Sequence, residues 1–307
     1  MKKILGVNIS HHCSCAYFEN NILKEYYEED RFNKQKGFDP DETKKNNFYY
    51  EYQMFKKFKN ITFDVVVFAS HDRGHIQLET PIIEKCLKQL NYKKYYFNIN
   101  NHHIYHATCG YYFSKYKEAI ALISDGGGEM PINPLFRVLQ SIFLINEKEV
   151  IPKYKYFSNK KVDYFNNFVP IEQYHKKEID YVMSSKSKAG SKYIEYLDKT
   201  NFKIGEEGQL MGIAAYKNKG TDLDKNVLEI ANKAQDETLK DIIDLIEKAK
   251  EYSDCKNLIL SGGYHLNCLN NFKLVKLYPE YNFFVDPVPY DAGTAIGGVF
   301  FYENYLQ

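Results

Sequence analysis

The chain has 307 residues, of which 44% are hydrophobic and 26% charged, and this composition excludes general disorder. Its 41 basic and 40 acidic residues nearly cancel, which excludes a strong overall field for a polyanion but leaves a local basic face open. The six cysteines lack zinc-ligand spacing, so we expect reduced thiols. No apolar run approaches the roughly 20 residues of a membrane span, and we expect a cytoplasmic protein without a membrane partner.

The first part of the chain predicts an alternating α/β lobe. Apolar, β-prone runs alternate with segments of helical spacing, and the polar turn Glu19-Asn-Asn21 joins two of the runs as a hairpin. Three antiparallel strands should therefore open the lobe. The expected strands cover residues 3–9, 15–18, 22–27 and 64–70, and the expected helices cover residues 42–58 and 81–90.

The same pattern starts again in the second part of the chain, with strands expected at residues 119–124, 136–145, 150–156 and 257–260. Two lobes that each open with a strand ending in a Gly- or Ser-rich turn are typical of the actin, hexokinase and Hsp70 type of fold. We therefore predict an α/β, actin-like ATPase fold of the ASKHA, ribonuclease H-like class. Its first lobe would cover residues 1–115 and its second lobe residues 116–307, around one cleft.

Residues 153–203 are rich in Lys, Tyr and Ser, and we expect them to elaborate the second lobe. Basic and aromatic residues alternate in Lys153-Tyr-Lys-Tyr-Phe157, as they do where proteins bind nucleic acid through phosphate contacts and stacking. A solvated surface is the other interpretation. We favour it here because lysine and tyrosine are abundant throughout the chain.

Two histidines stand four residues apart in a segment, residues 101–110, that predicts a buried helix. This spacing places His102 and His106 on one helical face, about 6 Å apart at Cβ, where they can share one cation. His103 points elsewhere. A single buried histidine is more often structural, so a metal site requires further ligands.

Asp125 supplies one such ligand, because it follows a buried strand and its carboxylate should face the cleft. Three glycines come next. Gly126, Gly127 and Gly128 can adopt positive φ and direct backbone N–H groups toward a phosphate. An ordinary hairpin turn is the alternative.

A second strand, glycine turn and helix follow at residues 258–268, an arrangement that points N–H groups of a helix start at an anion. Gly262, Gly263 and Asn267 are therefore predicted nucleotide contacts. Asp291 begins a later helix, where alone it would be an N-cap. The four candidate metal ligands, a mixed nitrogen and oxygen set suited to Fe²⁺, Mn²⁺ or Zn²⁺, are His102, His106, Asp125 and Asp291.

Several short blocks occur in a fixed order along the chain. They are Gly6-Val-Asn-Ile-Ser-His11, Glu28-Glu-Asp-Arg-Phe32, His102-His-Ile-Tyr-His106, Asp125-Gly-Gly-Gly-Glu129, Gly208-Gln-Leu-Met-Gly-Ile-Ala214, Ser261-Gly-Gly263 with Asn267, and Asp291-Ala-Gly-Thr294. In these blocks, and nearly from end to end, the chain resembles the O-carbamoyltransferases of antibiotic and nodulation-factor biosynthesis. Their N-terminal domain is related to the tRNA threonylcarbamoyl-transfer protein.

The resemblance implies that the four candidate ligands bind a metal, with iron expected first. It also implies that the donor is a carbamoyl-adenylate made from carbamoyl phosphate and ATP, with Mg²⁺ as a further candidate ion, and that an acceptor hydroxyl attacks its carbonyl carbon. His11 would contact the carbamoyl group or remove the acceptor proton, or else be a hydrogen-bonded turn histidine. His12 stands where the family usually has Asp, and Arg31 with Lys34 would supply acceptor-side charge.

Members of this family usually continue into a YrdC-like domain that makes the adenylate, whereas this sequence ends at Gln307. Either a separate YrdC-like protein is a partner, or this cleft handles carbamoyl phosphate and ATP itself. A short, A/T-biased member is similar to phage versions associated with hydroxymethylated pyrimidines. We therefore expect 5-hydroxymethylcytosine in DNA as the acceptor, residues 153–203 as the DNA-facing segment and the host cytoplasm as the location; a homodimer stays open.

Three other functions stay open at this point. They are carbamoylation of a small-molecule or sugar hydroxyl, threonylcarbamoyl transfer to tRNA, and a non-catalytic ATP-binding regulator. The Asp125-Gly-Gly-Gly-Glu129 block argues against the tRNA reaction. The complete set of metal ligands argues against the regulator.

Overall fold

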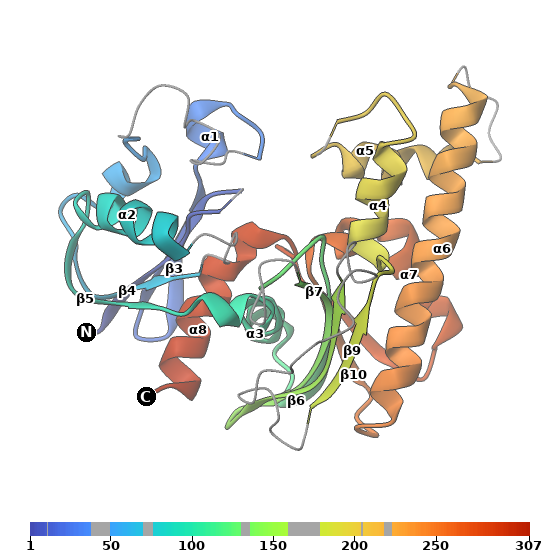
Figure 1. Cartoon of the computed structure of the whole chain (residues 1–307). Helices are drawn as coiled ribbons and strands as arrows, with labels where there is room; N and C mark the ends of the chain where they lie inside the picture. Colours follow the sequence, from blue (N-terminus) through green and yellow to red (C-terminus); the bar gives the residue numbers. More distant parts are fainter. Residues whose placement is uncertain are drawn as a thin grey trace.

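Two mixed β-sheets form the framework of the molecule, and two helices lie between them (Figure 1). The computed structural model describes residues 1–10, 12–37, 50–69, 76–129, 136–158, 179–203, 205–217 and 223–307. Both termini lie on the side of the first sheet, where Lys2 forms an ion pair with Glu303 at 2.5 Å.

The first sheet has the strand order β3-β2-β1-β4-β5. β1 is antiparallel to β2, and β2 to β3, whereas β1, β4 and β5 run parallel. Asn20 and Asn21 take φ values of 50° and 64° in the β2–β3 hairpin, a conformation that Asn tolerates well. The strands are β1 (Lys3–Asn8), β2 (Ser14–Glu19), β3 (Ile22–Glu28), β4 (Thr62–Phe68) and β5 (Asn91–Phe97).

The second sheet repeats this order of five strands and adds one more. β6 is antiparallel to β7, β7 is antiparallel to β8, and β6, β10 and β11 run parallel, while β9 extends the sheet beside β8. The duplicated topology is that of the actin-like ATPase fold, as predicted. The strands are β6 (Glu118–Ser124), β7 (Arg137–Asn146), β8 (Val150–Ser158), β9 (Asp180–Ser184), β10 (Asn257–Ser261) and β11 (Asn282–Val285).

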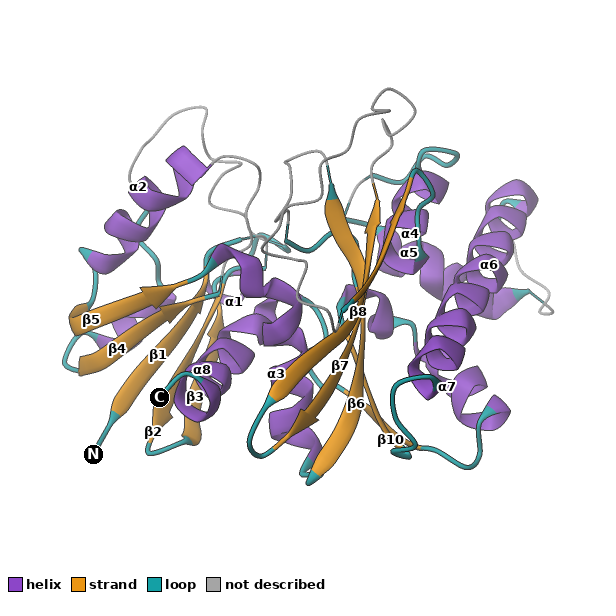
Figure 2. Cartoon of the chain, turned by 60° about the horizontal axis from the view of Figure 1, so that its bottom comes forward, coloured by secondary structure: helices purple, strands orange, loops and turns teal. Residues whose placement is uncertain are grey.

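Helices α3 (His102–Ser114) and α8 (Thr294–Tyr305) fill the space between the sheets (Figure 2). α3 follows the first sheet in sequence but packs on the second, and α8 follows the second sheet but packs on the first. The expected division near residue 115 therefore separates the strands of the two sheets. It does not separate the helices in the same way, because α3 and α8 each pack on the sheet of the other half. They approach closely at Gly297, where an added Cβ would lie 1.8 Å from the carbonyl oxygen of Tyr105.

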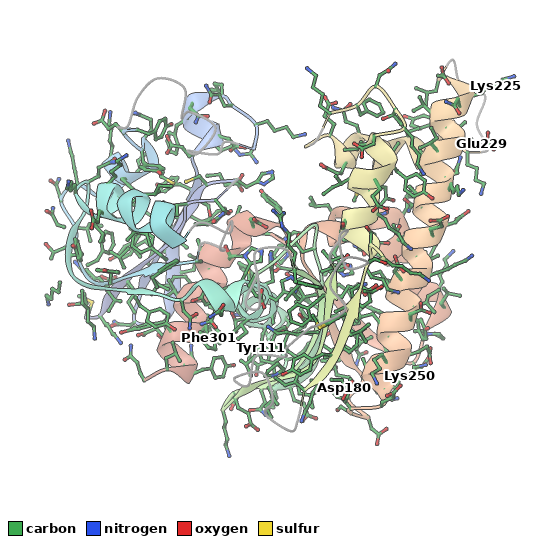
Figure 3. The ribbon with its side chains drawn as sticks, in the orientation of Figure 1. Tyr111, Asp180, Lys225, Glu229, Lys250 and Phe301 are labelled. Carbon is green, nitrogen blue, oxygen red and sulfur yellow. The ribbon has the colours of Figure 1, made fainter. Side chains whose placement is uncertain are left out.

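The remaining helices cover the outer faces of the sheets. The first sheet packs against η2 (Met54–Phe58) and α2 (Ile76–Leu87), and α1 (Asp30–Asn33) follows β3. The second sheet packs against α4 and α6. The two ends of α6, Lys225 and Lys250, are labelled in Figure 3. The elements of this layer are α4 (Ala189–Leu197), α5 (Glu207–Ile213), η6 (Ala214–Tyr216), α6 (Lys225–Lys250), η7 (Gly263–Leu266) and α7 (Cys268–Leu277).

Two sequence expectations need correction. Residues 42–49 of the expected helix at 42–58 lie outside the described residues, and residues 50–53 are not helical, which leaves only the short 3₁₀ helix η2. The interpretation of Lys153-Tyr-Lys-Tyr-Phe157 as a solvated surface is also wrong, because this run belongs to β8, which lies between β7 and β9 in the sheet. Tyr154, Lys155, Tyr156 and Phe157 are all buried there.

No helix in the described part of the chain combines the length and the apolar character needed to cross a membrane. Even α6, with 26 residues, carries charged side chains along its length.

Candidate metal centre

Helix α3 presents two histidines side by side in the interior of the molecule. His102 and His106 are each 0% exposed, and their Nε2 atoms lie 3.2 Å apart. The four-residue spacing places both rings on one face of the helix. α3 is buried around most of its surface because it lies between α8 and the second sheet, so both imidazoles are shielded from water.

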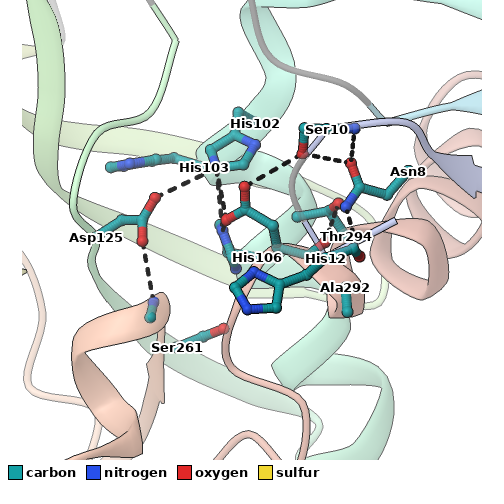
Figure 4. Close-up of polar contacts among 12 residues, drawn as sticks. Asn8, Ser10, His12, His102, His103, His106, Asp125, Ser261, Ala292 and Thr294 are labelled. Atoms are coloured by element: carbon teal, nitrogen blue, oxygen red, sulfur yellow. Dashed lines mark hydrogen bonds and ion pairs between the residues drawn. The ribbon is translucent and has the colours of Figure 1, made fainter. Parts of the chain in front are cut away.

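Two aspartates from distant parts of the chain complete the cluster (Figure 4). Asp125 follows β6 and places Oδ2 3.4 Å from His102 Nε2. Asp291 lies in η8 (Asp291–Gly293), just before α8, and its Oδ1 is 3.6 Å from His102 Nε2 and 3.7 Å from His106 Nε2. One ligand atom from each of the four residues lies within 4.8 Å of the other three. The four predicted ligands therefore meet in one place.

The second oxygen of each aspartate is held by a neighbouring group. Asp125 Oδ1 accepts a hydrogen bond from the N–H of Gly263 at 3.1 Å. The hydroxyl oxygen of Ser10 lies 3.3 Å from Asp291 Oδ2 and 2.7 Å from Asn8 Oδ1, so its single proton can be donated to either of these two oxygens. Ser10 and Asn8 belong to the Gly6–His11 block, which was the only sequence sign of their role. Such outer partners orient metal ligands.

The charges of the cluster favour a cation at its centre. Burial alone would lower the pKa of His102, but Asp291 and Asp125 raise it to about 9. Burial likewise opposes ionisation of Asp125, yet the hydrogen bond with His102 holds its pKa well below the usual range. Two carboxylates thus stabilise positive charge between them, and a divalent cation would supply that charge.

The donor set also fits a transition metal. Ligand atoms bound to one ion at about 2.0–2.2 Å can lie at most about 4.4 Å apart, close to the spread found here. Two imidazole nitrogens and two carboxylate oxygens suit Fe²⁺, Mn²⁺ or Zn²⁺. His102, His106, Asp125 and Asp291 would therefore hold such an ion after small side-chain shifts.

The glycines after Asp125 do not take the backbone conformation expected from the sequence, and nucleotide contacts from them stay a prediction. Gly126, Gly127 and Gly128 all lack the positive φ that we expected of them. The N–H of Gly128 donates to Val138 at 2.7 Å, and an added Cβ there would lie 2.4 Å from the ring of His103. Gly128 instead allows close packing beside α3.

The second glycine turn supports the metal ligands directly. Gly262 takes a φ of 96°, and an added Cβ would lie 2.3 Å from the carbonyl oxygen of Ser124, so a side chain does not fit. The N–H of Gly263, a predicted nucleotide contact, donates to Asp125. Direct nucleotide contacts from Gly262 and Gly263 stay a prediction.

Asn267 has a structural role that the sequence did not indicate. Its amide donates to Tyr193 at 2.9 Å and Gln235 at 3.0 Å, and its oxygen accepts from Gln235 at 2.8 Å and from the N–H of Asn270 at 3.2 Å. These contacts cap α7 and tie it to α4 and α6. A nucleotide contact from Asn267 would have to compete with them.

The predicted acceptor-side residues lie in the first lobe. His11 is outside the described residues. His12 has a φ of 58°, and its ring packs edge-on against Tyr290, the neighbour of Asp291, with centroids 5.0 Å apart. Arg31, whose side chain is 73% exposed, forms an ion pair with Glu28 at 3.5 Å. Glu28 also accepts the Tyr290 hydroxyl at 2.7 Å, which links Arg31 to the edge of the metal centre.

Comparisons with known proteins agree with this architecture. The sequence model of the family described as "Carbamoyltransferase N-terminus" matches residues 16–300. A search of curated proteins found no match.

Among solved structures, full-length HypF in a phosphate- and nucleotide-bound form is 12% identical over 97% of this chain and 55% of its own, with a TM-score of 0.56. HypF from T. kodakarensis is 14% identical over 99% of this chain and 48% of its own, with a TM-score of 0.53. A ROK family protein from Streptococcus pneumoniae TIGR4, in complex with sucrose, is 9% identical over 98% of both chains, with a TM-score of 0.48. The HypF likenesses show the fold alone, and this chain spans about half of each HypF chain.

Proposed function

Because the chain belongs to the carbamoyltransferase family, we propose that it transfers a carbamoyl group from carbamoyl-adenylate to an acceptor hydroxyl, at the centre formed by His102, His106, Asp125 and Asp291. The observation that carries the proposal is the convergence of these four buried side chains between the two sheets. HypF, which shares this fold, has been solved in a phosphate- and nucleotide-bound form, and this supports a nucleotide as one component of the reaction.

The reaction needs a held donor and an acceptor that loses a proton. The hydroxyl oxygen forms a bond to the carbonyl carbon, the bond from that carbon to the phosphate oxygen breaks, AMP leaves with the electron pair, and the hydroxyl proton passes to a base. A divalent cation held by the four ligands would supply positive charge for the phosphate. Shielding of the ligands from water strengthens such charge interactions.

Several first-lobe groups are suited to the acceptor side. His11 and His12 follow β1 and are candidates to contact the carbamoyl group or to accept the hydroxyl proton. Arg31 offers an exposed guanidinium that Glu28 holds near Tyr290. A guanidinium binds phosphate well, so an acceptor that carries phosphates, such as DNA containing 5-hydroxymethylcytosine, is the acceptor we test first.

The test is mass spectrometry of acceptors after incubation with carbamoyl phosphate, ATP and Fe²⁺, with and without a YrdC-like protein. The acceptors are DNA containing hydroxymethylcytosine, the free hydroxymethylated nucleotide and a sugar. We expect an adduct in which CONH₂ replaces one hydrogen. Product only in the presence of the YrdC-like protein would assign adenylate formation to that partner.

His106→Ala provides the matched control, because it removes a ligand and should abolish the product. An adduct on a sugar but not on DNA would overturn the DNA acceptor while leaving carbamoyl transfer standing. Tight ATP binding with no carbamoylated product on any acceptor would contradict the proposed function.

A further inference from the structure

Beside the metal centre lies a buried ion pair that carbamoyl transfer does not itself require. Glu129 is 0% exposed and Lys155 is 4% exposed, and Lys155 Nζ lies 2.5 Å from Glu129 Oε1. Glu129 ends the Asp125–Glu129 block, and Lys155 comes from β8. Removing two charges from water is costly, and apolar residues would often serve the fold equally well. We therefore looked for a role of the Glu129–Lys155 pair other than stabilising the fold.

The other oxygen of Glu129 reaches the start of α3. Glu129 Oε2 accepts a hydrogen bond from the backbone N–H of His103 at 3.1 Å. The N–H groups of a first helical turn have no partner within the helix. Here the N-cap Asn101 makes no side-chain cap bond, and the first turn has no acidic residue. Glu129 thus supplies from outside the acceptor and the negative charge that a helix start favours.

Further contacts fix this turn against the second sheet. His103 Nδ1 lies 2.8 Å from the hydroxyl oxygen of Ser141 on β7. Gly128 packs against the His103 ring, and the N–H of Gly128 donates to Val138 at the start of β7 at 2.7 Å. The segment around Glu129 is therefore tied to β7, and α3 is tied to that segment.

We propose that Glu129 and Lys155 are positioning residues: they clamp the first turn of α3 to the second sheet, so that the two histidine ligands face the two aspartates. This inference rests on the metal centre of the proposed function. His102 is the residue next to His103, so a shift of the clamped turn displaces its ring directly. Lys155 supplies the positive charge that compensates the buried carboxylate of Glu129.

The clamp is tested by titrating the full chain, freed of metal by a chelator, with Co²⁺ and following its absorption. We expect Glu129→Gln and Lys155→Met each to weaken Co²⁺ binding by about 10- to 100-fold, as loss of outer partners commonly does. The double variant should bind more tightly than Lys155→Met alone. The double variant leaves no buried charge unpaired, whereas Lys155→Met leaves the carboxylate of Glu129 without its partner.

Glu29→Gln is the matched control. Glu29 is also 0% exposed and accepts the backbone N–H groups of Gln53 and Met54, each at 2.9 Å, at the start of η2. None of these partners is a metal ligand. We expect this variant to lower the thermal midpoint while leaving Co²⁺ affinity unchanged, which separates positioning from general stability.

The outcomes distinguish the clamp from the metal centre itself. Equal Co²⁺ affinity in Glu129→Gln and the unaltered protein would overturn the clamp alone. Should Lys155→Met fail to fold, Glu129→Gln and the double variant still decide the question. Failure of the unaltered protein to bind Co²⁺ would overturn the metal centre and the clamp together.

Discussion

Each aspartate of the metal centre divides its two carboxylate oxygens between two tasks. Asp125 turns one oxygen to His102 and the other to the N–H of Gly263, and Asp291 turns one to the histidines and the other to Ser10. This division fixes the direction of each carboxylate before an ion arrives. Preorganisation of this kind lowers the cost of binding.

Acid should weaken the fold through Glu129. Burial opposes its ionisation, but Lys155 and His103 lower its pKa from 4.5 to about 2. A folded-state pKa below the unfolded value gives stability that is full above about pH 4.5 and is lost as the pH falls toward 2. We expect the unaltered protein to lose about 2 kcal/mol more unfolding free energy than Glu129→Gln between pH 7 and pH 3, measured in urea. Equal losses in the two proteins would show that Glu129 does not titrate in this way.

The crossing of α3 and α8 joins the two sheets. α8 carries Ala295, Ile296 and Val299 against the first sheet, whereas α3 carries Ala107 and Tyr111 against the second. The helices touch each other along their length, and the hydroxyl of Thr108 donates to the carbonyl of Gly297 at 2.8 Å. Metal ligands at the start of α3 and just before α8 are thereby held at one junction.

Gly297→Ala should disturb this junction severely. The added methyl group would lie 1.8 Å from a backbone oxygen of α3, which cannot move without displacing that helix. We expect a loss of at least about 3 kcal/mol in urea unfolding. Gly212→Ala in α5 is the control, because an added Cβ meets nothing within 4 Å there, and it should be neutral or stabilise by up to about 1 kcal/mol. Equal effects of the two changes would contradict the close packing of α3 on α8.

The sequence could predict the elements with strong apolar patterns and the ligands that carry unusual chemistry. The run Val65-Val-Val67 predicts the buried strand β4. The four-residue spacing of His102 and His106 predicts that both lie on one face of a helix. The sequence could not predict that Lys155 is buried, because its partner Glu129 is 26 residues away and meets it only in the folded sheet. For the same reason the sequence could not show that two backbone N–H groups of the glycine turns already have partners: the N–H of Gly128 donates to Val138 of β7, and the N–H of Gly263 donates to Asp125.

At the scale of the whole molecule, the ligands span the junction of two repeated halves. α3 follows the first sheet in sequence, Asp125 follows the first strand of the second sheet, and Asp291 precedes α8, which packs on the first sheet. Ser10, whose hydroxyl lies 3.3 Å from Asp291 Oδ2, comes two residues after the end of β1. An ion at this point would link both lobes.

Metal binding should therefore raise the thermal stability of the entire chain. At an ion concentration about 100-fold above Kd, binding adds about 2.7 kcal/mol, which corresponds to a rise of several degrees in the unfolding midpoint. Calorimetry with Fe²⁺ or Mn²⁺ against a chelator measures the difference. His106→Ala should show no difference, and an equal rise in that variant would place the ion elsewhere.

The most direct measurement is elemental analysis of the purified protein alongside its carbamoyl transfer activity. The four-ligand centre predicts about one transition-metal ion per chain, with loss of both metal and activity in His106→Ala. Metal-free protein that transfers carbamoyl groups at full rate would contradict the account.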